Sequence, residues 1–315
     1  VLFRSLNPFS WQNNNPCWTQ NKMNTDSVAS VATARVKDVV DDAKSTFSTH
    51  GLDHPANDAE WLMMSIIHCS RSDFFLHPDK LLSSEQHNKF QQAVNRRIKG
   101  EPPQYIIGEM EFYGRSFKVN PSVLIPRPET ERLISETIPM TRLFNRPKII
   151  DIGVGSGNIA ITLAKELPES TIVGVEVSKE AVAVAEENKI LHKSENFMCI
   201  CLDVLTHHPD GIFDIMVSNP PYISVDEMSG IMSDVREFEP RSALTDGSDG
   251  LMFYKRYIQL APLILVPGGW MIFEVGGGNH SEKVYNLFAH SAFQHCELIK
   301  DYNGDDRILK VQYCG

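Results

Sequence analysis

The fold of this chain is decided by one short stretch, Ile149-Ile150-Asp151-Ile152-Gly153-Val154-Gly155-Ser156-Gly157-Asn158. A largely apolar run typical of a buried strand leads into three glycines at alternate positions, and helical periodicity follows. Glycine permits a tight turn and lets a ligand approach the backbone without a Cβ in the way. The dinucleotide-binding fingerprint needs its third glycine at position 158, which is Asn158 here. The spacing therefore indicates a ligand that has no pyrophosphate.

Beyond this stretch, short apolar runs alternate with segments of helical periodicity from residue 148 to the end. Strands are expected at residues 148–153, 171–177, 197–203, 213–218, 269–275, 296–301 and 307–313. Helices are expected at residues 158–167, 179–191, 250–265 and 280–288. This alternation predicts an α/β fold with a parallel sheet covered on both faces. The last two strands are joined only by residues 302–306, too few for a parallel crossover, so the final strand should be antiparallel.

The rest of the chain predicts a second, smaller domain. Residues 26–104 show helical spacing of apolar side chains, which predicts a small helical domain but no chemistry. We expect this domain to serve in substrate recognition. Residues 105–128 are predicted to be a β-hairpin and linker, with a turn at Gly114 followed by prolines that force extended backbone. Residues 129–315 are predicted to form the α/β domain.

The first 25 residues contain no Asp or Glu, and the sequence begins with Val1. We expect residues 1–25 to be a disordered segment, a fragment of upstream sequence or a transit peptide. A transit peptide would direct the protein to the mitochondrial matrix, and otherwise we expect it in the cytoplasm.

Composition excludes several classes of protein. The 315 residues include 30 Lys and Arg against 40 Asp and Glu, a formal net charge of −10. This balance argues against a protein whose affinity comes from neutralising nucleic-acid phosphates. No apolar run reaches the ~18–20 residues that cross a bilayer. The 6 cysteines form no C-x-x-C pair, so neither a disulfide framework nor a metal site is predicted.

Acidic side chains follow the second and third predicted strands of the sheet. Glu176 is 23 residues after Gly153, where a carboxylate can accept both ribose hydroxyls of a nucleoside. Asp203 is placed to meet the edge of an adenine. The alternatives are that Glu176 is a solvated strand-end charge and that Asp203 caps a helix. Together with the glycine turn, this layout resembles the Rossmann-like class I methyltransferases, which use S-adenosylmethionine and whose sheet also ends in an antiparallel strand.

The fourth predicted strand runs directly into Asn219-Pro220-Pro221-Tyr222. Two prolines fix two φ angles and make a rigid edge at the carboxyl end of the sheet. The Asn219 side-chain oxygen and the Pro220 carbonyl can each accept one hydrogen of a planar –NH₂ group, while Tyr222 packs on its face. This tetrapeptide is characteristic of methyltransferases that act on amino groups conjugated to a π system. Adenine, guanine and the glutamine side-chain amide remain open as substrates.

Further segments are similar to one family, the release-factor glutamine N5-methyltransferases (HemK/PrmC-like). They are Pro103-Gln104-Tyr105-Ile106-Ile107-Gly108, Leu124-Ile125-Pro126-Arg127-Pro128-Glu129-Thr130-Glu131 and Asp301-Tyr302-Asn303-Gly304-Asp305-Asp306-Arg307. The resemblance implies that the substrate is the glutamine of a Gly-Gly-Gln motif in a peptide-chain release factor. This sequence differs from the family pattern at Val204, because family members often have an aromatic residue at that position.

The same resemblance implies roles for individual residues. The cofactor would contact Gly153, Val154, Gly155, Ser156, Gly157, Glu176, Asp203, Val204 and Asn219. The substrate would contact Asn219, Pro220, Pro221 and Tyr222. Arg127 and Glu129 would either shape the substrate channel or tie the hairpin to the sheet.

Two other functions remain as alternatives. One is a methyltransferase acting on adenine or guanine in DNA or rRNA, and the other is a binding module without activity. The acidic charge and the lack of a separate base-reading domain favour a protein substrate. We therefore expect a release factor as partner, no direct nucleic-acid contact, no membrane association and a monomer.

Overall fold

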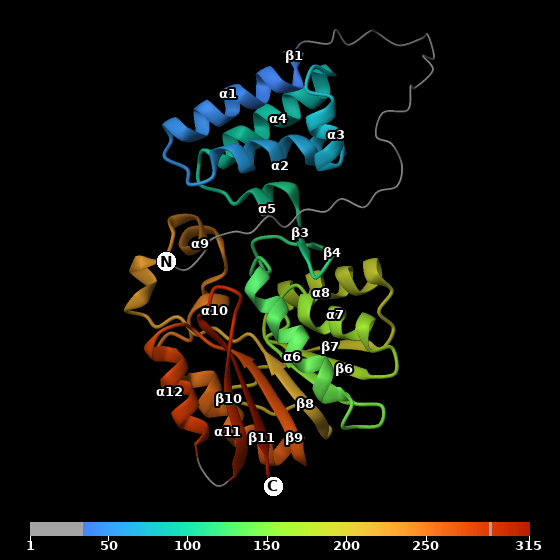
Figure 1. Cartoon of the computed structure of the whole chain (residues 1–315), viewed down its shortest axis with the longest axis vertical. Coiled ribbons are helices and arrows are strands. Elements are labelled where there is room, and N and C mark those ends of the chain that lie inside the picture. Colours follow the sequence, from blue (N-terminus) through green and yellow to red (C-terminus); the bar gives the residue numbers. More distant parts are fainter. Residues whose placement is uncertain (1–33, 290–291) are drawn as a thin grey trace. The chain divides into compact units, whose positions relative to one another are not determined.

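A computed structural model of the protein describes residues 34–289 and 292–315 (Figure 1). The predicted segment 1–25 and residues 26–33 of the predicted helical domain lie outside the described residues. The chain divides into two compact units between Glu109 and Met110. This division falls inside the predicted linker.

The unit before Met110 is helical, in agreement with its spacing of apolar residues. Its helices are α1 (Val36–Thr49), α2 (Pro55–Ile67), α3 (Arg71–Leu76), α4 (Ser84–Arg97) and α5 (Pro103–Ile107). Val40 of α1, Leu62 of α2 and Phe90 of α4 belong to one buried cluster. Each such side chain contributes roughly 1.5–3 kcal/mol by leaving water. A two-residue ladder of β1 (Ala34–Arg35) with β2 (Leu81–Leu82) was not predicted, because strands this short show no periodicity.

The unit after Glu109 is built on a seven-stranded sheet with the order β10-β11-β9-β8-β5-β6-β7. Its strands are β5 (Lys148–Ile152), β6 (Thr171–Glu176), β7 (Phe197–Cys201), β8 (Phe213–Ser218), β9 (Leu265–Glu274), β10 (Phe293–Lys300) and β11 (Asp306–Tyr313). Strands β5 to β9 pair in parallel, whereas β11 is antiparallel to both β9 and β10. The predicted α/β fold with an antiparallel final strand is confirmed.

Helices cover both faces of this sheet (Figure 1). They are α6 (Glu131–Thr141), α7 (Asn158–Glu166), α8 (Lys179–His192), α11 (Met252–Ile264) and α12 (Asn279–Phe288). Successive side chains of a strand point to opposite faces. Accordingly, Ile149 packs in the cluster that holds α6, α7 and α8 residues, and Ile150 packs in the cluster that holds α11 and α12 residues.

Some elements were not predicted. Helix α6 contains Pro139, a residue that normally ends a helix, and this obscured its pattern. Strand β9 begins at Leu265, before the predicted start at residue 269, because the irregular register opposite Phe213 accommodates Pro267. Short helices η1 (Pro128–Thr130), η2 (Glu227–Gly230), α9 (Ser233–Phe238) and α10 (Arg241–Leu244) were also missed. Over the described residues, no helix has both the length and the apolar character of a membrane span.

The predicted hairpin is present as β3 (Glu109–Phe112) and β4 (Arg115–Lys118). Its turn residues, Tyr113 and Gly114, both have positive φ. Asn188 of α8 accepts a hydrogen bond from the Lys118 amide at 2.7 Å and donates one to the Lys118 carbonyl at 2.9 Å. The Tyr113 amide donates to Glu131 at 2.8 Å. Strand β4 and the turn are therefore fastened to the helices beside the sheet.

Candidate active site

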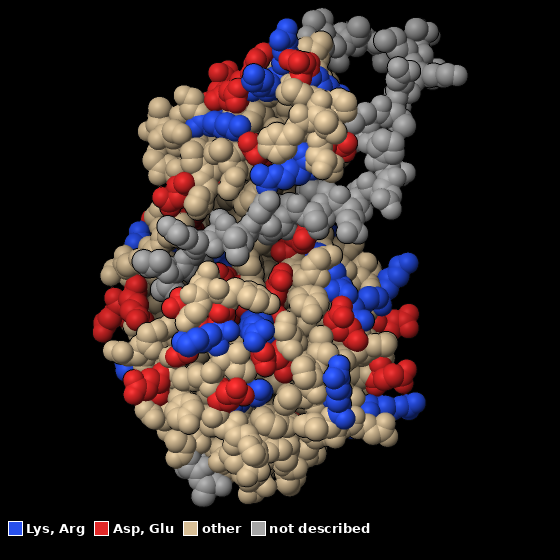
Figure 2. All heavy atoms as spheres, viewed as in Figure 1, with Lys and Arg blue, Asp and Glu red and all other residues tan. Residues whose placement is uncertain are grey.

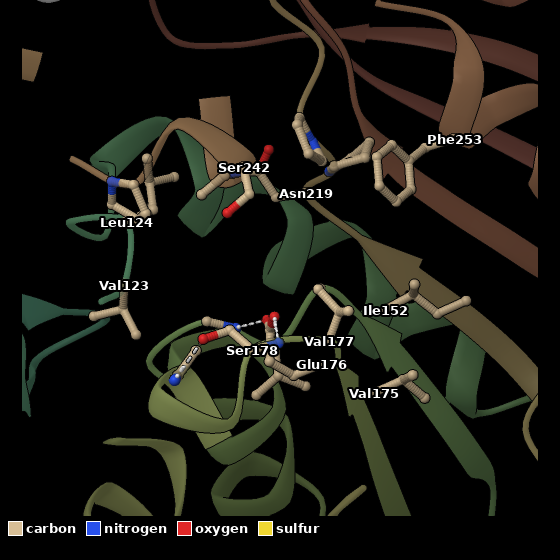
Figure 3. Close-up of a pocket in the computed structure, with 18 of the residues that line it drawn as sticks. Val123, Leu124, Ile152, Val175, Glu176, Val177, Ser178, Asn219, Ser242 and Phe253 are labelled. Atoms are coloured by element: carbon tan, nitrogen blue, oxygen red, sulfur yellow. Dashed lines mark hydrogen bonds between the residues drawn. The ribbon is translucent and has the colours of Figure 1, made fainter. Parts of the chain in front are cut away.

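A cavity of about 370 Å³ lies at the carboxyl ends of β5, β6 and β8. The glycine turn after β5, the end of β6, the turn after β7, the segment after β8 and parts of residues 122–130 form its walls (Figure 3). Open α/β sheets bind ligands at this edge, because the loops of successive parallel strands converge there.

The structure brings most of the predicted site residues to this cavity. Those that line it are Gly153, Val154, Gly155, Ser156, Glu176, Asp203, Val204, Asn219, Pro220, Pro221 and Arg127. Gly157, Tyr222 and Glu129 are not part of its lining.

The glycine turn owes its shape to backbone conformation. Gly153 and Gly157 have φ angles of 83° and 82°, in the left-handed region that glycine adopts freely. Gly157 caps α7, and a Cβ there would lie 2.8 Å from Cδ1 of Ile161. A Cβ on Gly153 would meet nothing within 4 Å. The turn is thus held by glycine geometry, and it leaves open space where a ligand can approach.

Glu176 joins two loops of the cavity. Its two carboxylate oxygens accept hydrogen bonds from the Gly155 and Ser178 amides, both at 3.0 Å (Figure 3). A carboxylate has about four lone-pair sites, so two amide donors leave acceptor capacity toward the cavity. The side chain is therefore fixed in place and still able to accept ligand hydroxyls.

Asp203 and Val204 occupy the turn after β7. Asp203 accepts hydrogen bonds from the Leu205 amide at 2.9 Å and the Thr206 hydroxyl at 3.0 Å, so it organises a turn and caps no helix. Val204 is buried and presents an aliphatic surface to the cavity. Phe253 of α11 adds an aromatic ring to the lining (Figure 3). This ring stands in a helix with ordinary apolar periodicity, which is why the sequence did not distinguish it from a core residue.

The segment after β8 is held by a chain of hydrogen bonds that runs from the partly buried Asn219 to a buried carboxylate. Asn219 donates through Nδ2 to the Thr130 hydroxyl at 3.1 Å, and that hydroxyl donates to Glu274 at 2.6 Å. The Tyr222 hydroxyl donates to the other oxygen of Glu274 at 3.2 Å. Glu274 is only 2% exposed, and burial raises its pKa above the usual carboxyl value. Burial, and after it the charge of Glu274, raise the pKa of Tyr222, so this phenol stays protonated at neutral pH.

Arg127 has a structural partner as well as a place in the cavity wall. Its guanidinium pairs with Glu239 at 2.5 Å, and the other oxygen of Glu239 accepts the Ile125 amide at 3.0 Å. Glu239 is buried at the end of α9. Arg127 therefore lines the cavity, and its ion pair ties residues 125–127 to the end of α9 instead of tying the hairpin to the sheet.

Comparisons with known proteins agree with this architecture. Residues 38–108 match the PrmC N-terminal domain family, and residues 129–235 match the methyltransferase small domain family. The chain is 39% identical to the release factor glutamine methyltransferase of Geobacter sulfurreducens over 87% of this chain and 95% of that protein. The chain belongs to the release factor glutamine methyltransferase family.

A second family member shows a comparable match. The release factor glutamine methyltransferase of Fusobacterium nucleatum is 37% identical over 86% of this chain and 77% of that protein. Among solved structures, a methyltransferase from Pyrococcus furiosus is 18% identical over 74% of this chain and 99% of that one, with a TM-score of 0.44. Membership of the family makes the chain a methyltransferase and confirms the resemblance drawn from its motifs.

Proposed function

We propose that this enzyme transfers the methyl group of S-adenosylmethionine to the side-chain amide nitrogen of the glutamine in the Gly-Gly-Gln motif of a peptide-chain release factor. The observation that carries the proposal is that Asn219 and Pro220, whose side-chain oxygen and carbonyl are both acceptors, lie next to each other in the cavity lining. The names of the relatives support the release factor as substrate. They do not support the alternative of an adenine or guanine substrate.

The residues of the cavity fit S-adenosylmethionine. Glu176 is held by two amides and offers its remaining lone pairs to ribose hydroxyls. Val204 and Phe253 present apolar surface that suits an adenine, and the open turn at Gly153 admits a close approach to the backbone. When bound, the cofactor supplies an electrophilic methyl group on a sulfonium. Gly157 would shape the turn before α7. Asp203 shapes the turn after β7 and, as part of the cavity lining, would offer its remaining lone pairs to the edge of the adenine.

The protein's own residues would orient the substrate amide relative to the methyl group. The Asn219 oxygen and the Pro220 carbonyl would each accept one N–H of the substrate amide and so hold its nitrogen in line for transfer. Fixing two reacting groups in this way can supply about 7–11 kcal/mol of barrier reduction in favourable cases. Tyr222 is protonated and donates to Glu274, so it orients the tetrapeptide and does not act as a base. The amide nitrogen can lose its proton during or after transfer.

The partner and location follow from the same proposal. On the face shown in Figure 2, acidic and basic side chains of the described residues are interspersed, and this favours a protein substrate over a nucleic acid. The relatives named above are bacterial proteins, which supports a cytoplasmic location over the mitochondrial one. We retain the monomer as a prediction.

The test is methylation of a purified release factor with labelled S-adenosylmethionine, in the wild-type form and in a Gly-Gly-Ala form. We expect one methyl group on the wild-type glutamine, located by peptide mass spectrometry, and none on the Ala form. Asn219→Ala should abolish transfer and leave cofactor affinity within a few fold. Equal labelling of both forms, or full turnover by Asn219→Ala, would refute the proposal.

A further inference from the structure

Three side chains far apart in the sequence meet at the cavity, two of them in its lining and the third, Glu274, outside it. Asn219 follows β8, Thr130 ends η1 and Glu274 ends β9. We call the hydrogen-bonded series Asn219–Thr130–Glu274 the amide relay. Thr130 and Glu274 are each 2% exposed, so bulk water does not compete for these hydrogen bonds.

The direction of each hydrogen bond in the amide relay can be assigned from chemistry. Glu274 accepts from the Tyr222 hydroxyl and from the Thr130 hydroxyl, the latter at 2.6 Å. A hydroxyl has one hydrogen, so once Thr130 donates to Glu274 it can only accept from Asn219. The group of Asn219 that faces Thr130 must then be its NH₂, at 3.1 Å.

This assignment decides what Asn219 offers to a substrate. Rotation of its amide by 180° would exchange oxygen and nitrogen with almost no change of shape. Within the described residues, its oxygen accepts no hydrogen bond, and the side chain lines the cavity. The amide relay therefore fixes the NH₂ group on Thr130 and leaves the Asn219 oxygen as a free acceptor on the side of the cavity.

We propose that Glu274, acting through Thr130, holds the Asn219 amide with its oxygen toward the substrate and thereby makes the site select a side-chain amide over a carboxylate. The inference rests on the proposed function, in which Asn219 receives the substrate amide. Thr130 and Glu274 are positioning residues in this scheme. A glutamine amide presents N–H donors to the oxygen, whereas a glutamate in its place presents only acceptors and is repelled.

The main variant is Thr130→Val, which keeps the shape of the side chain and removes the hydroxyl. The Asn219 amide can then flip, and we expect kcat with the release factor to fall about tenfold or more, in keeping with the loss of one buried hydrogen bond. Cofactor affinity should stay within about twofold, because Asn219 remains in place. Thr130→Ser restores the hydroxyl and should recover most of the lost turnover.

A matched control is Thr137→Val in α6. Thr137 is fully buried and its hydroxyl donates to the Leu133 carbonyl at 2.7 Å, but it does not line the cavity. This substitution removes the same chemical group outside the amide relay. We expect unchanged turnover from it.

A second readout separates positioning from general loss of structure. A Gly-Gly-Glu form of the release factor is used as an inhibitor at a pH where its glutamate is ionised. The wild-type enzyme should bind it much more weakly than the Gly-Gly-Gln form, and Thr130→Val should reduce this preference about tenfold. Glu274→Gln should also reduce it, because an amide can donate to Thr130 and so reverse the relay. If Thr130→Val does not fold, Glu274→Gln alone provides the test of amide preference.

The outcomes are distinct. Reduced kcat and reduced amide preference in Thr130→Val, with recovery in Thr130→Ser, support the relay. Unchanged amide preference in both Thr130→Val and Glu274→Gln overturns it, provided that Asn219→Ala is inactive. If Asn219→Ala keeps its activity, the proposed role of Asn219 in binding the substrate amide is refuted. The relay is then refuted as well, because it acts only through Asn219.

Discussion

We expect the buried carboxyl group of Asp151 to make the protein less stable to unfolding as the pH rises. This aspartate lies on the interior strand β5, between β8 and β6, it is fully buried, and neither carboxylate oxygen has a hydrogen-bond partner. Burial, and to a lesser degree the charge of Glu176, raise the pKa of Asp151 from 3.8 to about 7. The Ala160 amide opposes this rise but does not reach hydrogen-bonding geometry.

The sign and size of the effect follow from proton linkage. Between pH 3.8 and about 7 the folded protein keeps a proton on Asp151 that the unfolded chain loses. Stability therefore falls as pH rises through this window, by about 1.4 kcal/mol for each pH unit. Over the whole window the loss is about 4 kcal/mol. Asp151→Asn removes the titrating group and nearly preserves its shape, so the variant should escape this loss.

The assay is thermal unfolding of wild type and Asp151→Asn, followed by calorimetry at about pH 5 and about pH 8. Over that interval the stability advantage of the variant should grow by about 3 kcal/mol. For a unit of this size the advantage in melting temperature should grow by about 6–12 °C. Asp210→Asn neutralises an exposed carboxylate and is the matched control. An advantage of Asp151→Asn that is equal at both pH values would refute the reasoning.

Two further substitutions test the cofactor site and the core. Glu176→Ala should weaken cofactor binding by ~1–3 kcal/mol, the cost of losing a charge-assisted hydrogen bond, while the exposed Glu180→Ala should not; equal affinities by calorimetry would place the ribose elsewhere. Gly174→Ala in β6 would bring a Cβ within 2.4 Å of Val154 and 2.9 Å of Phe197, so unfolding should become easier by about 1–3 kcal/mol. An unchanged melting temperature would show that this strand does not pack as tightly as the distances indicate.

Much of the fold could be predicted from short stretches of the sequence. Strands buried on both faces appear as short apolar runs, and five residues cannot form a parallel crossover, so β11 was correctly expected to be antiparallel. The glycine turn and Asn219-Pro220-Pro221-Tyr222 were recognised because glycine and proline restrict the backbone at their own positions. Helix α6 and the short helices after β8 escaped notice because proline or brevity hides their periodicity.

The hydrogen bonds and ion pairs between side chains of the candidate site could be identified only from the folded structure. Thr130 and Glu274 are 144 residues apart, and Arg127 and Glu239 are 112 residues apart. No local spacing signals such pairs, because they meet only when the strand order places the end of β9 beside the end of β8 and the linker crosses that edge. Sequence pattern thus identifies which side chains can do chemistry. Their orientation depends on long-range contacts, which only the packed sheet and its loops create.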